Sequence, residues 1–600
     1  MKKKIGLAIG LIVVVALGIG AKILYGKFSV VLPEYPAIGK TVWLDQHWSA
    51  EQRNWFHHAD QGTQTFGIPY EWFIALEQPL GSTTPSGMLS DPVYLDRYGF
   101  IPGNTDPGNA QLPIGFAHGG ALQNLDGTAV LNPQTKTPMT SLGLTCAACH
   151  TGRLAYQGTT ILIDGGPALT NLDNFQNGVG LALLYTRYWP GRFDRFAERV
   201  LGSGASAEAK SELRAQFDRV LTEDLTIHKL EESVKANTVE EGYARLDALT
   251  RIGNFVFSVD LGNNPANFAA YSAPVHFPRI WNASWFEWVQ YNGSIEQPMT
   301  RNAGEALGVR AAVNLTGGNV PLFTSSVRVQ TIYEIEQLLA GKPPDAQTGF
   351  TGLNSPKWPG TILPPVNAEL AAKGAVLYKE ICQECHMAPI SDPEFWTSSH
   401  WLPANSAGER HLNLEQIDVT HVGTDPSQAA DMKNRHVVIP SNLGITTNEF
   451  GGALGQFVTF TVNRWYDSQQ PPTSPAMREQ MDGNRPDGIR ALLSYKVRPL
   501  NGIWATPPYL HNGSVPNLYA LLSPVAERPA KFYLGNREYD PVNVGYVTDP
   551  LPGGFEFDTT IRGNSNSGHE FSDDKTKPGV IGRGLKPDER RALIEYLKTL

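Results

Sequence analysis

Apolar positions along the chain predict a mainly helical protein with long irregular connections and a few short strands. Between residues 205 and 255, apolar side chains recur every three or four positions, as expected of helices with one buried face. Residues 154–156 and 160–164 instead predict a strand pair. The side chains that set the helical spacing are Leu213, Phe217, Val220 and Leu221.

Two further helices are predicted in the last part of the chain. The first, over residues 367–380, begins with Asn367 as a cap and carries Gly374 and Tyr378 near one face. The second, over residues 587–600, begins with a proline followed by two acids, and its leucines and isoleucine lie on one face. We expect the second helix to pack across the first.

Composition and charge narrow the class of protein. The 600 residues include 59 glycines, 44 prolines and 10% aromatic residues, which favours a loop-rich fold. The net charge is −9 and the pI about 5.9. Because nucleic-acid binding needs clustered basic surface, we expect no nucleic-acid partner.

The first residues resemble a targeting segment. Residues 2–4 are lysines, and an apolar run follows over residues 5–21. This pattern predicts a signal anchor or signal peptide over residues 1–26. The uncleaved anchor is favoured, because no clean small-residue cleavage site follows the run. The basic start predicts that the chain after residue 26 crosses to the periplasmic side of a bacterial inner membrane. It would stay attached to the membrane there, or be soluble if the segment is cleaved.

All four cysteines fall into two copies of one motif. The copies are Cys146-Ala-Ala-Cys149-His150 and Cys382-Gln-Glu-Cys385-His386. Cys-x-x-Cys-His is the attachment motif of c-type haem, in which the thiols bond to the porphyrin and the histidine binds the iron. The motifs therefore predict two covalently bound haems. A thioredoxin-like thiol pair or a zinc site would also use Cys-x-x-Cys, but neither requires the adjacent histidine. The sequence leaves calcium binding open.

A second iron ligand decides whether each haem transfers electrons or reacts with small molecules. His511 is the strongest candidate, because two prolines stiffen its approach and Asn512-Gly513 makes a tight turn after it. The alternative reading is a surface turn with an incidental histidine.

Residues 498–519 (RPLNGIWATPPYLHNGSVPNLY) closely resemble the di-haem rubber oxygenase family, a branch of the bacterial di-haem cytochrome c peroxidase superfamily. The resemblance covers most of the chain after about residue 40. Shorter matching stretches are residues 112–116, 145–152, 301–308, 423–426 and 563–569.

The resemblance implies different roles for the two haems. The first, at His150, would keep one side of its iron open and be the reactive centre. The second would be closed by His386 and His511 and would relay electrons. In the wider superfamily methionine often takes the second position on the relay haem. Met432, Met477 and Met481 are the methionines that remain open for that role.

An aromatic cluster over residues 277–291 surrounds further candidates. Trp281 and Trp285 are candidates for lining the open haem or standing between the haems. His276 and Glu287 are candidate acid–base groups, because peroxide cleavage needs a proton moved between its two oxygens. The alternative is a packed aromatic core. His118 is one more candidate acid–base group.

The predicted fold class is mainly α with extensive loops and a few short β-hairpins, built as two cytochrome c-like haem domains. The proline-rich residues 341–365 are the predicted linker. Residues 27–340 would form the first, reactive domain and residues 366–600 the second. The haems would lie close together, with an aromatic side chain near the shortest path between them.

Three functions remain open. A peroxidase would reduce peroxide at the first haem with electrons from a small redox protein, passed on by the second. An oxygenase would use O2 to cleave carbon–carbon double bonds of an apolar substrate. An electron carrier would have protein ligands on both faces of both irons. The predicted anchor favours the peroxidase, because an enzyme for an insoluble polymer outside the cell should be released.

Overall fold

The computed structural model describes residues 30–37, 39–79, 87–103, 112–318 and 320–600. Helices hold 38% of the chain and strands 14%, which confirms the predicted excess of helix over strand. The predicted targeting segment, residues 1–26, lies outside the described residues. In the part that is described, no helix has the length and apolar composition needed to cross a bilayer.

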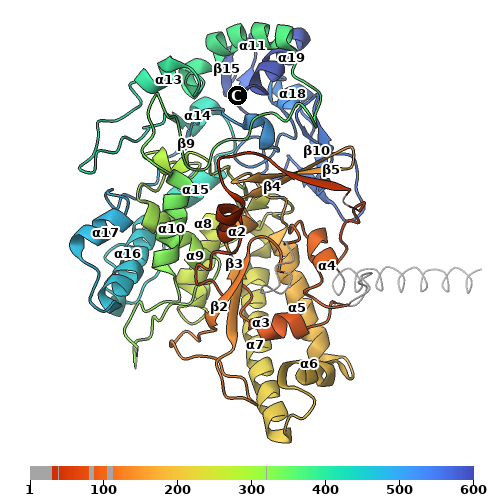
Figure 1. Cartoon of the computed structure of the whole chain (residues 1–600), viewed down its shortest axis with the longest axis vertical. Coiled ribbons are helices and arrows are strands. Elements are labelled where there is room, and N and C mark those ends of the chain that lie inside the picture. The colour runs from red at the N-terminus through yellow and green to blue at the C-terminus, as the bar shows by residue number, and fades with distance from the viewer. Residues whose placement is uncertain (1–29, 38, 80–86, 104–111, 319) are drawn as a thin grey trace, which may run out of the picture.

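A three-stranded sheet carries the first cysteine motif at its edge (Figure 1). β4 (Thr151–Tyr156) and β5 (Thr159–Asp164) form the predicted antiparallel pair, and β1 (Lys40–Trp43) runs parallel to β5. β4 begins directly after His150, so the sheet fixes the position of this histidine. The other strands before residue 340 are β2 (Phe116–Ala121), β3 (Thr140–Leu144), β6 (Arg245–Leu246) and β7 (Val275–His276).

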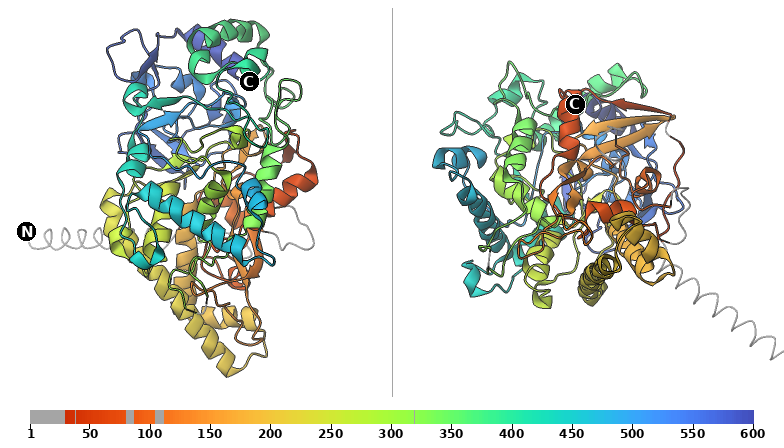
Figure 2. Two further views of the ribbon diagram at one scale, coloured as in Figure 1. Left: turned by 90° about the vertical axis from the view of Figure 1, so that its left-hand side faces the viewer. Right: turned by 60° about the horizontal axis from the view of Figure 1, so that its bottom comes forward.

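A group of helices lies below this sheet in Figure 1 and at the lower end of the molecule in the left-hand view of Figure 2. α7 (Ala207–Val234) and α8 (Ala248–Asn254) occupy the span of residues 205–255 for which helices were predicted. Aromatic side chains fill the space between these helices and the strands β2 and β3. The helices of this part of the chain are α2 (Ala50–His58), α3 (Tyr70–Ala75), α4 (Pro92–Arg97), α5 (Leu172–Tyr188) and α6 (Arg192–Leu201).

A second group of helices combines segments from both halves of the chain. α9 (Pro298–Gly308) packs on α8, and α16 (Phe450–Ser468) packs on α9. These helices share one apolar cluster with α10 (Val329–Ala340). Residues after the predicted linker therefore help to enclose helices that precede it.

The last helix packs across the helix that precedes the second motif. α11 (Ala368–Ile381) and α19 (Pro587–Leu597) lie side by side at the upper end of Figure 1. Asn367 caps α11 by accepting a hydrogen bond from the backbone N–H of Leu370, as predicted. Gly374 allows the close approach, because a Cβ at this position would lie 2.1 Å from the carbonyl oxygen of Ala592.

Residues 341–365 are irregular but buried in part. Phe350, Leu353 and Leu363 are each 5% exposed or less, and Trp504 donates a hydrogen bond to the carbonyl oxygen of Pro356. The largest apolar cluster joins residues from both sides of this segment. The division into two haem domains stays a prediction, and the core is continuous across the proposed boundary.

The remaining elements follow the second motif and fill the upper and left-hand parts of Figure 1. The helices are α12 (Gln383–His386), α13 (Pro393–Thr397), α14 (Val419–Val422), α15 (Ser427–Asn434), α17 (Pro475–Met481) and α18 (Leu518–Leu521). The strands are β8 (Gln416–Asp418), β9 (Ser494–Lys496), β10 (Lys531–Leu534), β11 (Tyr539–Asp540), β12 (Gly545–Tyr546), β13 (Phe555–Asp558), β14 (Glu570–Phe571) and β15 (Val580–Gly582).

The α11–α19 contact can be tested by replacing Gly374 with alanine, because helix propensity and close packing predict opposite changes in the free energy of unfolding. In an open helix, replacing glycine by alanine stabilises by roughly 0.5–1 kcal/mol. Gly374→Ala is instead expected to lower the free energy of unfolding by about 1–3 kcal/mol, because the new methyl group meets the backbone of α19. Denaturant unfolding followed by circular dichroism measures the change. Gly204→Ala is the control, because a Cβ there meets nothing within 4 Å. A stabilised Gly374→Ala protein would contradict the packing described.

Candidate functional site

The first motif lies at a short turn between β3 and β4. Cys146 begins the 3-10 turn η1 (Cys146–Ala148), which Thr145 caps through its side-chain oxygen. The Nδ1–H group of His150 donates a hydrogen bond to the carbonyl oxygen of Pro278, 2.9 Å away. This bond leaves the Nε2 lone pair of His150 available for a metal ion.

The second motif repeats this arrangement at the end of α11. Cys382 ends α11, and α12 carries Cys385 and His386. The Nδ1–H group of His386 donates to the carbonyl oxygen of Arg498, 2.8 Å away. Both motif histidines are therefore held from behind by a backbone carbonyl, with Nε2 left as a ligand.

Burial keeps these groups neutral. It raises the pKa of Cys146, Cys149 and Cys382 to about 12, and lowers the pKa of His150 and His386 to about 4. A thioredoxin-like pair needs a thiol whose pKa is lowered, so this alternative is disfavoured. The two motifs line different cavities, so the four thiols do not meet in one site. No group of three or more metal-ligating side chains was found among the described residues.

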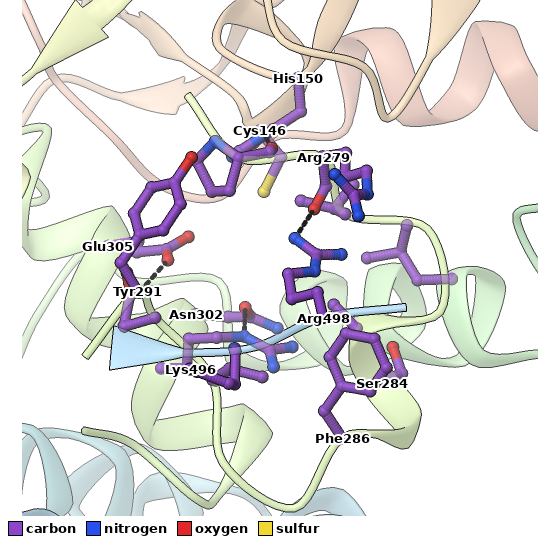
Figure 3. Close-up of a pocket in the computed structure, with 17 residues that line it drawn as sticks. Cys146, His150, Arg279, Ser284, Phe286, Tyr291, Asn302, Glu305, Lys496 and Arg498 are labelled. Carbon is purple, nitrogen blue, oxygen red and sulfur yellow. Dashed lines mark hydrogen bonds between the residues drawn. The ribbon is translucent and has the colours of Figure 1, made fainter. Parts of the chain in front are cut away.

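The first motif lines what we call the N-terminal cavity, which consists of a smaller and a larger hollow that adjoin. The smaller one is drawn in Figure 3. The larger hollow has a mostly apolar wall, and α16 contributes Leu454 and Val458 to it. The side chains common to both hollows are Cys146, His150, Pro278, Gln290, Tyr291, Arg301 and Glu305.

α9 brings a buried carboxyl group into the N-terminal cavity. Glu305 accepts a hydrogen bond from Nε2 of Gln290 at 3.0 Å. Burial raises the pKa of Glu305, against the opposing effect of nearby Arg301. Arg301 itself is paired with Glu336 of α10 at 2.5 Å. In Figure 3, Glu305 lies beside Tyr291, across the hollow from Arg279 and Arg498. Glu305 is thus a buried acid with one fixed partner in the same cavity as the first motif.

The second motif lines a single hollow, here called the C-terminal cavity. His569 lies next to His386 in it, with 6.2 Å between the ring centres. A metal–imidazole bond is about 2.0–2.1 Å long and a ring nitrogen lies roughly 1.1 Å from its ring centre, so two imidazoles on opposite sides of one ion have centres about 6.2–6.4 Å apart. The observed separation matches this value.

His511 also lines the C-terminal cavity, but aromatic rings hold it. Its ring stacks on Tyr495 with 4.1 Å between centres and meets Tyr291 edge-on at 6.1 Å. The backbone carbonyl of Asp425 faces one of its ring nitrogens. The prediction that His511 binds the second iron stays a prediction, and the distance between the His386 and His569 rings favours His569 for that position.

The two cavities share one wall. The side chains that line both are His276, Arg279, Tyr291, Lys496 and Arg498, and we call this group the common wall. Tyr291 is the aromatic side chain among them, in the place where the sequence led us to expect an aromatic between the two sites.

The structure separates the four residues nominated as catalytic. His276 lies in the common wall, with Nε2 buried and without a hydrogen-bond partner among the described residues. Trp281 and Trp285 are core side chains whose indole N–H groups donate to the carbonyls of Asn501 and Ala340. Both tryptophans, and Glu287, are absent from the walls of the cavities described above. Their catalytic roles stay predictions without support from position.

His276 is also poorly placed to act across the first iron. It lies two residues before Pro278, whose carbonyl holds His150 from behind. Glu305 of α9 comes from another element and lines the same cavity as His150.

His118 is half-buried and lines neither cavity. Its ring stacks on Tyr70 with 4.4 Å between centres.

Sequence reasoning missed Glu305, His569 and the buried cations of the common wall. Glu305 and His569 both fall in stretches already noted for their family resemblance, residues 301–308 and 563–569. That resemblance was the only signal in the sequence that could have pointed to them. Nothing in the spacing of the chain indicates that they would face the motif histidines.

The residues present fit a haem in each cavity. A haem needs a long hollow with apolar walls, an imidazole for its iron and cations for its carboxylate side groups. The N-terminal cavity offers Cys146, Cys149 and His150 for attachment, and the C-terminal cavity offers Cys382, Cys385 and His386. The cationic side chains of the common wall line both cavities.

Comparison with known proteins agrees with this chemistry. A family model described as RoxA-like, cytochrome c-like matches residues 494–533, which include His511 and the cations at 496 and 498. The match supports haem as a cofactor and a haem-dependent oxidoreductase. The uncharacterized protein y4iM of Sinorhizobium fredii is 26% identical over 343 residues, which cover 54% of this chain and 63% of y4iM.

A much closer relative covers nearly the whole chain. The uncharacterized protein y4iJ of Sinorhizobium fredii is 56% identical over 574 residues, which cover 96% of this chain and 95% of y4iJ. The chain therefore belongs to the family of y4iJ, and its RoxA-like region supports a place among the RoxA-like di-haem cytochromes.

Proposed function

We propose that the chain is a di-haem c-type cytochrome that reduces peroxide at the N-terminal cavity with electrons delivered to the C-terminal cavity. Both haems would be attached covalently, through Cys146 and Cys149 and through Cys382 and Cys385. The basic and apolar start of the sequence supports export to the periplasmic side of the inner membrane.

The observation that carries the proposal is the difference between the two cavities. Beside His386 lies a second imidazole, that of His569, with 6.2 Å between the ring centres, which is the separation expected of two ligands on one ion. The N-terminal cavity has a hydrogen-bonded acid, Glu305, and apart from His150 and His276 no histidine or methionine lines it among the described residues. One closed and one open iron is the arrangement that a relay and a reactive centre require.

The chain's own groups supply the proton transfer. Reduction of hydrogen peroxide consumes two electrons and two protons and yields two waters. Glu305 would take a proton from the oxygen of peroxide nearer the metal and deliver it to the farther oxygen. Gln290 holds the carboxyl group in position through its hydrogen bond. When bound, haem would supply the electrons and the metal site at which the oxygen–oxygen bond breaks.

Exposure of the second motif supports a protein as electron donor. Cys385 is exposed, Cys382 is half-buried, and His421, which also lines the C-terminal cavity, is exposed. A haem attached there would have one edge near the surface, where a small redox protein could dock. We therefore propose electron entry at this cavity.

The apolar end of the N-terminal cavity favours a second candidate function. Side chains of α8 and α16, among them Leu249, Ile252 and Leu454, form this end. An oxygenase that cleaves an apolar alkene would need such a wall beside its iron. Oxygen consumption with an alkene substrate, together with no turnover of peroxide, would support this function instead. A carrier without catalysis would show neither activity.

Covalent attachment at each motif is tested by mass. The denatured wild-type chain is expected to carry the mass of two haems, because both thiol pairs line haem-sized cavities. Cys146→Ser/Cys149→Ser and Cys382→Ser/Cys385→Ser should each carry one. Mass spectrometry of the unfolded proteins measures this, and each variant serves as the control for the other. A wild-type chain without added haem would contradict the proposal.

We infer that His569 closes the second iron. Electron paramagnetic resonance of the oxidised protein at low temperature should contain a low-spin signal of two imidazole ligands. This signal is expected to disappear in His569→Ala, because the ring beside His386 is removed. His511→Ala is the matched comparison and should keep the signal. The reverse result would return the ligand role to His511.

Glu305→Gln tests the acid–base role. The amide keeps the size of the side chain but cannot move a proton, so kcat/KM for hydrogen peroxide is expected to fall about 10²–10⁴-fold. Stopped-flow absorbance with a reduced electron donor measures the rate. Glu334→Gln, an exposed carboxylate on α10, is the control. Full activity of Glu305→Gln with normal haem content would exclude Glu305 from the proton transfer.

A further inference from the structure

The common wall contains three cations that no carboxylate balances. Arg279 follows Pro278, Lys496 is the last residue of β9, and Arg498 lies two residues after Lys496. Figure 3 shows all three around the smaller hollow of the N-terminal cavity. Among the described residues no acidic side chain lies within ion-pair distance of any of them, whereas neighbouring Arg301 is paired with Glu336.

Several nitrogens of these cations lack partners. Nε of Arg279 and Nε of Arg498 are buried without a hydrogen bond among the described residues, and so is Nη1 of Arg301. Burial lowers the pKa of Arg279 to about 10. Burial, together with the positive charges of Arg498 and Arg301, lowers the pKa of Lys496 well below its ordinary value. Since an unpaired buried charge is strongly unfavourable, the cluster requires an anion that the chain does not supply.

The same residues connect the two motif histidines through hydrogen bonds. His150 donates to the carbonyl of Pro278, the residue before Arg279. Nη1 of Arg498 donates to the carbonyl of Arg279 at 2.7 Å. His386 in turn donates to the carbonyl of Arg498 at 2.8 Å. A change in the charge of this cluster is therefore felt at both histidines.

The geometry points to a carboxylate-binding site, formed by Arg279, Lys496 and Arg498, that takes propionate groups of the haems in both cavities. The inference rests on the proposed function, because it assigns the anion to the cofactors of those cavities. Haem combines an apolar ring with an anionic edge. The N-terminal cavity likewise combines an apolar hollow with a cationic one.

Such a site would set the reduction potentials of both centres. A nearby positive charge stabilises the reduced, more electron-rich state of a haem. Because the cluster lines both cavities, removing one of its charges should lower both potentials together. A merely structural role for these side chains would not produce that paired shift.

The test uses the holoprotein and a spectroelectrochemical titration of both haems. Lys496→Met removes the charged ammonium group, which makes no hydrogen bond among the described residues. Lys496→Arg keeps the charge. Arg498→Met is a second neutral variant. In each neutral variant we expect both potentials to fall by an amount equivalent to at least a tenfold change in the ratio of oxidised to reduced haem, which is 59 mV for one electron. Lys496→Arg should stay near the wild type.

A fall in one potential only, or in neither, would overturn the shared site. The source of the anion is tested by repeating the wild-type titration in increasing sodium acetate. Constant potentials are expected if propionates fill the cluster, and potentials that move with acetate would assign it to a soluble anion. Failure of the proposed function is distinguishable from failure of the shared site, because the titration of the wild-type protein would then not show two redox-active haems.

Discussion

Two backbone carbonyls, those of Pro278 and Arg498, decide how the rest of the site is built. Each accepts the Nδ1–H of a motif histidine, which fixes the ring and leaves its other nitrogen for a metal ion. Since Arg498 also donates to the carbonyl next to Pro278, neither segment can move without the other. The positions of both histidines therefore depend on a single pair of segments that meet in the middle of the molecule.

From this centre outward the two sites differ in what faces the histidine. At the C-terminal cavity a loop near the end of the chain brings His569 beside His386. At the N-terminal cavity α9 brings a buried acid instead. Both histidines are thus held in the same way, but different groups line the remainder of each cavity. The proposed division of labour between relay and reaction rests on this difference.

Local signals in the sequence predicted much of the fold. The cap at Asn367 and the strand pair β4–β5 are set by neighbouring residues, so each could be read from spacing. The packing of α11 on α19 joins helices far apart in the sequence, and it was expected because cytochrome c domains begin and end with such a pair. The large apolar cluster and the α8–α9–α16 contacts join residues that lie hundreds of positions apart. No pattern along the chain encodes such contacts, so the continuity of the core across residues 341–365 was not foreseen.

The candidate site could likewise be predicted from the sequence only in part. Both Cys-x-x-Cys-His motifs are contiguous and were readable at once. The groups opposite them come from other elements, which is why Glu287 and Trp281 were nominated while Glu305 was not. Glu287 and Trp281 were nominated because they lie close in sequence to an aromatic cluster. Which residues lie close to the motif histidines in space depends instead on how α9 packs against α8 and α16.

The central claim is that one haem is open and the other closed. Titration of the fully reduced wild-type protein with carbon monoxide tests it directly, because carbon monoxide binds ferrous haem only where a coordination position is free. The account predicts one carbon monoxide bound for every two haems. Binding to both haems, or to neither, would contradict it.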